Sequence, residues 1–377
     1  MSRTHSPETV PVQPLKVAIV HDWLVGGGAE RVVAELHKLF PDAPIYTSYC
    51  SDEWRKRLDG KVVTGFLQRW PFGALRKYVG ILRIWWFTHL DLSAYDLVIS
   101  SSGNGEAKSI RTPKTTTHIC YCHAPTHFYW RHYEQYVQHP GFGVFDPLAR
   151  LGLRLLVAPL RGWDYKAAQR PDYFLANSAH TQAEIKQFYG RDATVIHPPV
   201  DTKRFATAQP QQRRGFVWAG RQVPAKRVDI LIAACNKLHV PLTIIGRGPD
   251  HDRLVQLAGP TIQFLTVDDD AALPGYFATA EAFLFPSYED FGVTPVEAMA
   301  AGTPVIAFKA GGALDYVIEG KTGLFFAHQA ADSLVETLKI FDGKRFDHAA
   351  IQKHALTFST AAFEQHMRSF IGTVMQK

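Results

Sequence analysis

Short apolar segments alternate along the chain with amphipathic segments of helical period. The apolar segments are rich in Val, Ile and aromatic residues and are apolar throughout, which is typical of parallel strands covered on both faces. We expect strands at 16–22, 44–50, 96–102, 118–122, 173–178 and 194–199, and again at 215–220, 241–246, 261–265, 282–287 and 304–308. Two such sets predict two doubly wound α/β domains rather than one wide sheet.

The break between the two sets is expected within 197–215, which carries prolines and glutamines and has no hydrophobic periodicity. The chain thereby divides into an N-terminal domain at 15–198 and a C-terminal domain at 199–358. Residues 1–14 are polar and proline-rich, and they predict a flexible tail rather than a secretory signal. The last stretch, about 359–377, predicts an amphipathic helix with a Ser or Thr cap.

The composition narrows the choice of partners. The net charge of +6 favours phosphates, anionic lipid surfaces or nucleic acid, and no nucleic-acid-binding motif is present. The 4 cysteines are too sparse for a disulfide framework, so a reducing cytosol is expected. No apolar run reaches the roughly 18 residues that a membrane-spanning helix needs.

A run of glycines, Gly26 to Gly28, lies between the first expected strand and an amphipathic helix. Glycines there let the backbone approach a ligand, and the helix N-terminus offers free N–H groups and partial positive charge. The spacing is not G-x-G-x-x-G, so the dinucleotide-binding fingerprint is absent. A tight turn that binds no ligand is the alternative interpretation.

Basic residues follow the first expected strand of the second half. Gly220 and Arg221 come directly after this strand, and Lys226 and Arg227 precede the next helix. Cations at such a crevice suit a diphosphate, because Arg donates forked hydrogen bonds and Lys supplies a point charge. A solvated basic loop is the alternative. A glycine-rich turn at 244–250 follows the next strand, again at the carboxyl end where such folds bind ligands.

Two glutamates, Glu289 and Glu297, lie in the stretch YEDFGVTPVEAMAAGTP. Thr294, Pro295 and Glu297 form a capping box at a helix start, which gives Glu297 a purely structural interpretation. Glu289 precedes this helix, and its alternative interpretation is an exposed loop acid. Gly292 would let the next backbone amides face a phosphate or a sugar, so the two acids could reach different parts of one ligand.

The stretch EDFGVTPVEAMAAGTPVIAFKAGGALDYV resembles the E-x7-E signature of retaining GT-B glycosyltransferases of the family 4 type. Further stretches that resemble this family follow its order over most of the chain, at 20–32, 122–130, 176–182, 197–205, 219–232 and 311–326. The opening HDWLVGGGAERVVAELHKLFPDAPIYT is similar to mannosyltransferases that extend bacterial surface polysaccharides. The resemblance implies two Rossmann-like domains that face a central cleft, the first for the acceptor and the second for the nucleotide sugar, with the final helix returning to the first domain.

The resemblance also implies roles for matched residues. Glu289 would bind hydroxyls of the donor sugar, and Glu297 would bind the nucleotide ribose. Arg221 and Lys226 would neutralise the donor diphosphate, and His123 would contact the donor sugar at the reaction centre. The backbone of a loop after the third strand of the second half would read the base. The remaining donor-binding positions are Gly27, Gly28, Val267, Phe291, Gly292, Val293 and Thr294.

The implied reaction is transfer of a hexose with retained configuration to a lipid-linked or saccharide acceptor in cell-surface glycan synthesis. Mannose from GDP-mannose is the expected donor group, and a UDP-sugar stays open because no residue fixes the base. The leaving phosphate would help to take the acceptor proton in a front-face attack, with His123 as an alternative base. Neither a cofactor nor a metal is expected, since no D-x-D motif is placed as a metal site.

Two other classes of function agree less well with the sequence. A non-catalytic sugar-nucleotide sensor would lack the reaction centre, whereas His123 and Glu289 are present here. A nicotinamide-dependent oxidoreductase would carry G-x-G-x-x-G, which is missing.

Histidines and cysteines are concentrated in the stretch HICYCHAPTH. Its candidate ligands would be His118, Cys120, Cys122, His123 and His127. Their spacing fits no familiar zinc pattern, and the cysteines belong to an expected buried strand. We therefore expect no metal there.

Two segments, 69–90 and 150–163, combine Arg and Lys with Trp, Phe and Leu. This mixture suits a membrane interface, where cations meet lipid phosphates and rings lie at headgroup level. Two core-facing helices with solvated basic faces are the alternative. The resemblance favours the lipid interpretation, because acceptors in the family are often polyprenyl-linked. We expect a cytoplasmic protein, peripheral at the inner face of the plasma membrane and attracted by anionic lipid.

Overall fold

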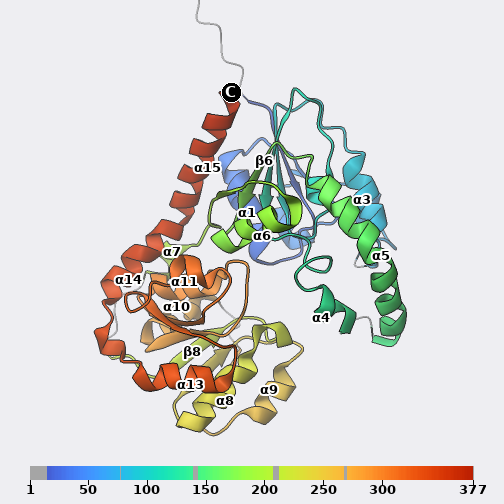
Figure 1. Ribbon diagram of the computed structural model, residues 1–377. Helices are drawn as coiled ribbons and strands as arrows, with labels where there is room; N and C mark the ends of the chain where they lie inside the picture. The colour runs from blue at the N-terminus through green and yellow to red at the C-terminus, as the bar shows by residue number, and fades with distance from the viewer. Residues whose placement is uncertain (1–14, 77, 139–142, 207–211, 267–269, 377) are drawn as a thin grey trace, which may run out of the picture.

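A computed structural model describes residues 15–76, 78–138, 143–206, 212–266 and 270–376. The predicted tail at 1–14 and the predicted base-binding residue Val267 lie outside the described residues. The described chain forms two parallel sheets, each covered by helices, one above the other in Figure 1. Two doubly wound domains were predicted, and the structure confirms them.

The first sheet contains strands β1 to β7. Their bounds are Val17–His21, Ile45–Thr47, Val62–Thr64, Leu97–Ser102, Thr117–Cys122, Tyr173–Ala176 and Thr194–Val195. The order is β3-β2-β1-β4-β5-β6-β7, with parallel pairing throughout. The order therefore reverses between β1 and β4. Open α/β sheets bind ligands outside the carboxyl ends of the strands at such a reversal.

The second sheet repeats this arrangement with β8 to β13. Their bounds are Phe216–Ala219, Leu242–Ile245, Ile262–Leu265, Ala282–Phe285, Val305–Phe308 and Gly323–Phe326. The parallel order β10-β9-β8-β11-β12-β13 reverses between β8 and β11. The basic loop therefore follows one strand of the reversal, and the Glu289 loop follows the other.

Each predicted apolar segment contains a strand, but two edge strands, β3 and β13, were not predicted. Neither is apolar and buried along its whole length. In β13, Gly323 is the first residue, and a Cβ atom there would lie 1.9 Å from the carbonyl oxygen of Val305. Glycine is therefore needed for the close pairing of β13 with β12.

Helices cover both faces of each sheet. In the first domain, α1 to α6 span Gly28–Leu39, Asp52–Arg57, Gly80–Thr88, Tyr133–Gln138, Asp146–Ala167 and Ala179–Tyr189, whereas α7, Thr202–Phe205, contributes Phe205 to the core of the second domain. In the second half, α8 to α15 span Val228–Leu238, His251–Leu257, Leu273–Thr279, Val293–Ala300, Ala313–Tyr316, Ala331–Ile340, His348–Ala355 and Thr360–Met375. Within the described residues, no helix is both long enough and apolar enough to cross a bilayer.

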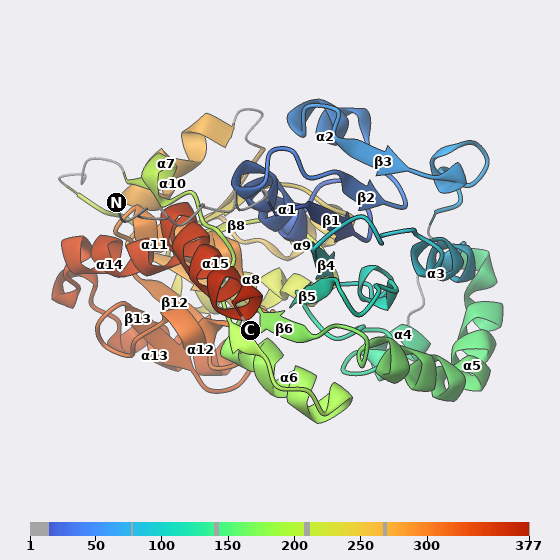
Figure 2. The same ribbon diagram turned by 90° about the horizontal axis from the view of Figure 1, so that it is seen from above.

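The last helix, α15, joins the first domain. Ser359 caps it by accepting a hydrogen bond from the backbone N–H of Ala362 at 3.2 Å, which confirms the predicted Ser or Thr cap. Phe363, Met367 and Ile371 are buried in the same core cluster as β1 and α1. Each side chain so buried contributes roughly 1.5–3 kcal/mol. Figures 1 and 2 show this helix running from the second domain along the side of the first.

Candidate active site

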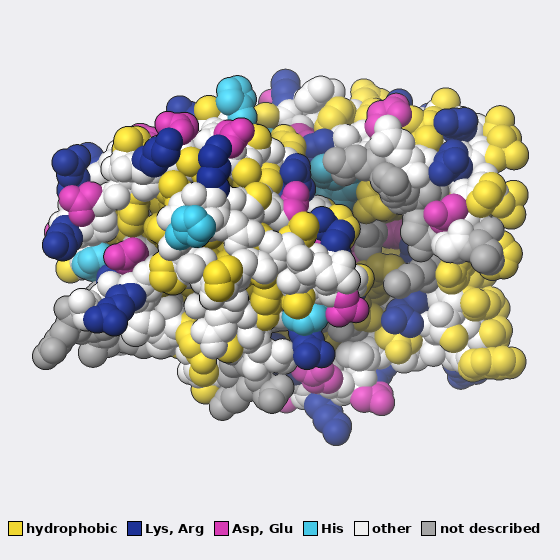
Figure 3. Space-filling model, turned by 90° about the horizontal axis from the view of Figure 1, so that it is seen from below, with side chains coloured by type: hydrophobic (Ala, Val, Ile, Leu, Met, Phe, Trp, Pro, Cys, Tyr) yellow, Lys and Arg dark blue, Asp and Glu magenta, His cyan; other side chains and the backbone are white. Residues whose placement is uncertain are grey.

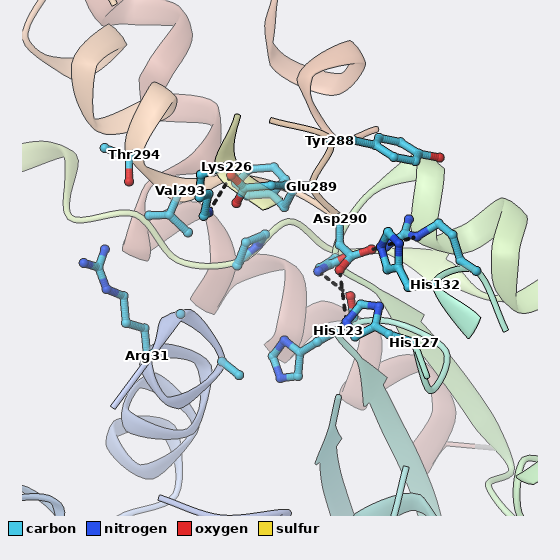
Figure 4. A pocket seen from close by; sticks show the side chains of 18 of the residues that line it. Arg31, His123, His127, His132, Lys226, Tyr288, Glu289, Asp290, Val293 and Thr294 are labelled. Carbon is cyan, nitrogen blue, oxygen red and sulfur yellow. Dashed lines mark hydrogen bonds and ion pairs between the residues drawn. The ribbon is translucent and has the colours of Figure 1, made fainter. Parts of the chain in front are cut away.

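A cleft of about 640 Å³ lies between the two domains, at the carboxyl ends of both sheets. Its lining joins the glycine turn of the first domain to the acidic loop of the second (Figure 4). The predicted site residues that line it are Gly27, Gly28, His123, Lys226, Glu289, Phe291, Gly292, Val293 and Thr294. The fold thus brings together residues from both halves of the chain.

The glycine turn forms the first-domain wall beside the start of α1. Glu30 holds it, because its Oε1 accepts a hydrogen bond from the N–H of Gly26 at 3.0 Å. A Cβ at Gly27 would lie 2.8 Å from Glu30 Oε2, whereas a Cβ at Gly28 would meet no atom within 4 Å. The start of α1 is therefore open toward the cleft, where its free N–H groups favour an anion.

His123 follows β5 and lies at the floor of the cleft. Its Nε2 is 2.8 Å from Ser101 Oγ, and His21 Nδ1 is 3.1 Å from the same oxygen. Burial, and then the neighbouring His21, lower the pKa of His123 to about 3. The imidazole is therefore neutral near pH 7. A base with so low a pKa removes a proton from a sugar hydroxyl inefficiently, which weighs against the alternative in which His123 is the base.

Lys226 and Glu289 meet on the second-domain wall. Lys226 ends a short 3-10 turn, Pro224–Lys226, after β8, and its Nζ lies 2.5 Å from Glu289 Oε1. The contact is an ion pair without hydrogen-bond geometry. Both side chains are only partly buried, so a ligand in the cleft can reach them. Figure 4 shows the Lys226 and Glu289 side chains next to each other in the cleft.

Two glycines hold the loop that carries Glu289. The N–H of Gly312 donates a hydrogen bond to the carbonyl of Glu289 at 2.9 Å. A Cβ at Gly311, which has a φ of +63°, would lie 2.3 Å from that same carbonyl oxygen. The glycine pair in the AGGALDYV stretch is therefore required for the loop to lie where it does.

The predicted capping box is wrong. The helix begins at Val293, and its N-cap is Gly292 with a φ of +86°, so Thr294 is already inside the helix and caps nothing. A Cβ at Gly292 would lie 2.7 Å from Phe285 Cζ, which explains the glycine. The sharp turn at this residue starts the helix two positions earlier than Pro295 indicated. The residues at the helix start, Gly292, Val293 and Thr294, line the cleft.

Glu297 has a partner that the sequence did not indicate. Arg31, from α1 of the first domain, donates a hydrogen bond from Nη1 to Glu297 Oε1 at 2.5 Å. Glu297 is buried and lies beside the cleft, in a neighbouring cavity that Arg31 also lines. A ribose at Glu297 would have to share the carboxylate with Arg31 or displace it. In the sequence, only its place at the end of the GGGAER stretch could have pointed to Arg31 as a site residue.

Arg221 differs from the other predicted donor residues. It is exposed and does not line the cleft, although it follows β8 as expected. Arg131, which no motif singled out, does line the cleft. Its guanidinium hydrogen-bonds Asp290 of the second domain and lies over the Tyr288 ring at 5.0 Å. With Arg31, it forms a bridge between the domains.

Within the part of the chain that the structure describes, one group of side chains has the spacing of a metal site: His180, Glu184 and Asp290. Arg131 already lies among them, with Nη1 3.1 Å from Glu184 Oε1 and further hydrogen bonds to His180 and Asp290. A metal ion would have to displace this guanidinium. In the predicted histidine and cysteine stretch, burial raises the pKa of Cys120 to about 12, so its thiol stays protonated.

Two family models match the chain. Glycosyltransferase Family 4 matches residues 26–204, and Glycosyl transferases group 1 matches residues 199–352. D-inositol 3-phosphate glycosyltransferase of Mycobacterium tuberculosis is 30% identical over 227 residues, which are 52% of this chain and 47% of that protein. The match thus spans about half the length of this curated relative.

Solved structures share the fold. HepE of Anabaena, in complex with UDP, has a TM-score of 0.68 and 18% identity, over 95% of this chain and 100% of that chain. Sucrose-phosphate synthase of Thermosynechococcus elongatus has a TM-score of 0.68 and 17% identity, over 96% of this chain and 100% of that chain. With both halves matched by family models and both sheets arranged around one cleft, the chain belongs to the GT-B glycosyltransferases of the family 4 type.

Proposed function

We propose that this protein is a glycosyltransferase that moves a sugar from a nucleoside diphosphate to an acceptor, with retained configuration. The observation that carries the proposal is the meeting of Lys226 and Glu289 with the starts of α1 and α11 in one cleft. The cation and the helix N–H groups suit a diphosphate, and the carboxylate suits sugar hydroxyls.

The chemistry follows from where charge develops. Cleavage of the bond between sugar and diphosphate leaves negative charge on the leaving oxygen, which Lys226 and the free N–H groups of the helix starts would stabilise. Glu289 would hold the sugar ring while its anomeric carbon becomes electron-poor. The neutral His123 would hydrogen-bond the sugar, and the leaving phosphate would accept the proton of the incoming hydroxyl. No metal is needed in this scheme.

GDP-mannose is the donor that we propose, on the resemblance of the first stretch of the chain to mannosyltransferases. The alternative is a UDP-sugar, which the UDP complex of HepE favours for a protein of the same fold. Inositol phosphate, named for the mycobacterial relative, is an example of a phosphorylated acceptor in this family.

One experiment tests both activity and donor. The purified protein is incubated with GDP-mannose, UDP-glucose or NAD in the presence of EDTA, and slow hydrolysis of each nucleotide is followed by chromatography. We expect release of GDP with little release of UDP and no reaction of NAD, and the anomer first released gives the stereochemistry. Binding of neither GDP nor UDP by calorimetry would contradict a sugar-nucleotide function altogether.

We further propose a lipid-linked or glycan acceptor and a peripheral position at the inner face of the plasma membrane. Large apolar side chains are exposed around α3 and the first half of α5, and we call this set the apolar face. Its members are Trp70, Leu75, Tyr78, Ile81, Leu82, Trp85, Phe145, Leu148, Leu151, Leu155 and Leu156. Yellow side chains gather in Figure 3 at the end of the molecule where α5 lies. Soluble monomers rarely expose so many neighbouring apolar groups without a partner.

A further inference from the structure

An apolar groove of about 480 Å³ runs between α3 and α5 in the first domain. The α5 wall contains Gly152, Leu153, Leu156 and Leu160, and apolar atoms dominate the rest of the lining. In Figures 1 and 2, α3 and α5 lie side by side at the end of the first domain, away from α15. Several of the apolar-face residues border the groove, so it opens onto the surface that we propose for the membrane.

The groove also reaches the candidate active site. Tyr136 of α4 lines both the groove and the cleft. Trp23 and Asn104 line the groove as well, and they follow β1 and β4, the strands where the order of the first sheet reverses. The inner end of the groove therefore lies at the same edge of the sheet as His123 and the glycine turn.

The polar groups of the groove are found at this inner end. Arg83 donates hydrogen bonds from Nε and Nη2 to Glu106 Oε1 at 3.1 and 2.6 Å, and its guanidinium lies 4.9 Å from the centre of the Trp23 ring. Glu106 is buried, and among the described residues its Oε2 has no hydrogen-bond partner. A buried carboxyl oxygen without a partner is costly unless a ligand supplies one.

The Glu106 carboxyl is suited to an oxygen-rich ligand. Burial raises its pKa to about 7, against the opposing effect of Arg83. Near neutral pH a part of the population is protonated, so Oε2 can donate a hydrogen bond to a phosphate or hydroxyl oxygen. The groove lining is thus polar near the cleft and apolar along α5. It matches an amphiphile whose polar head lies in the cleft and whose apolar chain lies along α5.

We propose that this groove holds the hydrocarbon chain of a lipid-linked acceptor, with the chain along α5 and the polar head directed past Glu106 to the cleft. This inference rests on the proposed glycosyltransferase function. A peptide is a poorer occupant, because its backbone N–H and C=O groups would find few partners along the leucine wall. A hydrocarbon chain has no such groups and can enter directly from a bilayer that contacts the apolar face.

The test fills the groove with a side chain. Gly152 lies on α5 and lines the groove, and a Cβ there would meet no atom within 4 Å. Gly152→Phe therefore occupies the groove without a backbone clash. Gly162→Phe is the matched control, since Gly162 lies on the same helix, has equal space at its Cβ and does not line the groove. Phe has a higher helix propensity than Gly, so both variants are expected to fold.

The probe is dodecyl phosphate below its micelle concentration, titrated by calorimetry into the full chain. We expect the unaltered protein and Gly162→Phe to bind it with equal affinity and Gly152→Phe to bind at least tenfold more weakly. Equal affinity in all three proteins, or no binding to the unaltered protein, would overturn the groove assignment. Nucleotide-sugar hydrolysis by the unaltered protein is measured separately, so a failed groove and a failed glycosyltransferase function give different results.

Discussion

At the scale of single residues, the site depends on a cation and a carboxylate held together. Lys226 and Glu289 come from different loops of the second domain, and their charged atoms lie 2.5 Å apart. A partly exposed ion pair of this kind contributes only about 0–1 kcal/mol to stability. Its placement in the cleft is therefore explained better by ligand binding than by folding.

The first prediction concerns Glu289. Glu289→Gln keeps the shape of the side chain but removes the charge that holds an electron-poor sugar, so turnover should fall about a hundredfold or more. Thermal unfolding should stay close to that of the unaltered protein. Glu336→Gln is the control, because Glu336 also pairs with a lysine, Lys339, but on an exposed helix outside the cleft. Unchanged turnover in the Glu289 variant would refute the assigned role.

The second prediction separates Lys226 from Arg221. Both were expected to neutralise the donor diphosphate, but only Lys226 lines the cleft. Lys226→Ala should weaken GDP binding about tenfold or more, since a charge-assisted hydrogen bond contributes roughly 1.5–3 kcal/mol. Arg221→Ala should weaken GDP binding less than Lys226→Ala does, because the Arg221 side chain is exposed and does not line the cleft. Calorimetry with GDP measures both variants, and unchanged affinity for Arg221→Ala would restrict the phosphate role to Lys226.

At the scale of elements, strand ends and helix starts place the chemistry. His123 follows β5, the glycine turn joins β1 to α1, and Glu289 lies between β11 and α11. The strands that carry these loops are buried, and β5 also buries a titratable group, His118. Its Nε2 is 2.8 Å from Ser100 Oγ of the neighbouring strand β4. Stability of the first sheet therefore depends on pH.

The third prediction follows from His118. Burial lowers its pKa from the ordinary value of 6.5 to about 3 in the folded protein. The unfolded chain therefore binds a proton first as the pH falls, so stability is full above about pH 6.5 and declines from there toward pH 3. Between pH 8 and pH 5, the titration of His118 should lower the free energy of unfolding by about 2 kcal/mol.

Urea unfolding at pH 8 and pH 5 measures this effect. The loss of stability between the two pH values should be smaller in His118→Gln than in the unaltered protein. Exposed His328 supplies the control, and His328→Gln should keep the full pH dependence. An equal loss in all three proteins would exclude His118 as the cause.

At the scale of the whole molecule, the site exists only where the two domains meet. Arg31 and Glu297 are 266 positions apart in the chain, yet they form an ion pair across the cleft. Arg131 reaches Asp290 in the same way, and Asp315 accepts hydrogen bonds from the N–H of Ala179 and from His197. The returning helix α15 adds a further connection on the outside.

The fourth prediction concerns the apolar face. The unaltered protein should float with vesicles that contain phosphatidylglycerol, and less so with purely zwitterionic vesicles or at high salt. Replacing Ile81 and Leu155 together by Glu should weaken binding tenfold or more, because each loses roughly 1.5–3 kcal/mol of apolar burial. Ile340→Glu is the control, since Ile340 is equally exposed but belongs to the second domain. Unchanged flotation of the double variant would contradict the membrane assignment.

The local pattern predicted the central strands well. The strand Ala282–Phe285 is apolar throughout because both of its faces are buried, and that burial can be read without knowing the partners. The edge strands β3 and β13 were missed, because each is short and is buried over only part of its length. The start of α11 was misjudged because Gly292 adopts a positive φ, and a Cβ there would lie 2.7 Å from Phe285 Cζ.

Two parallel α/β domains, the loops that carry Lys226 and Glu289, and the glycine turn could all be predicted from the sequence, since each depends on neighbours along the chain. Three features required the tertiary structure. Arg31 pairs with Glu297, Arg131 lies among the side chains that have the spacing of a metal site, and Arg221 lies outside the cleft. The groove between α3 and α5 likewise could not be predicted from the sequence. These features join segments far apart in the sequence, and no periodicity or motif encodes which side chains meet when two separate sheets close on each other.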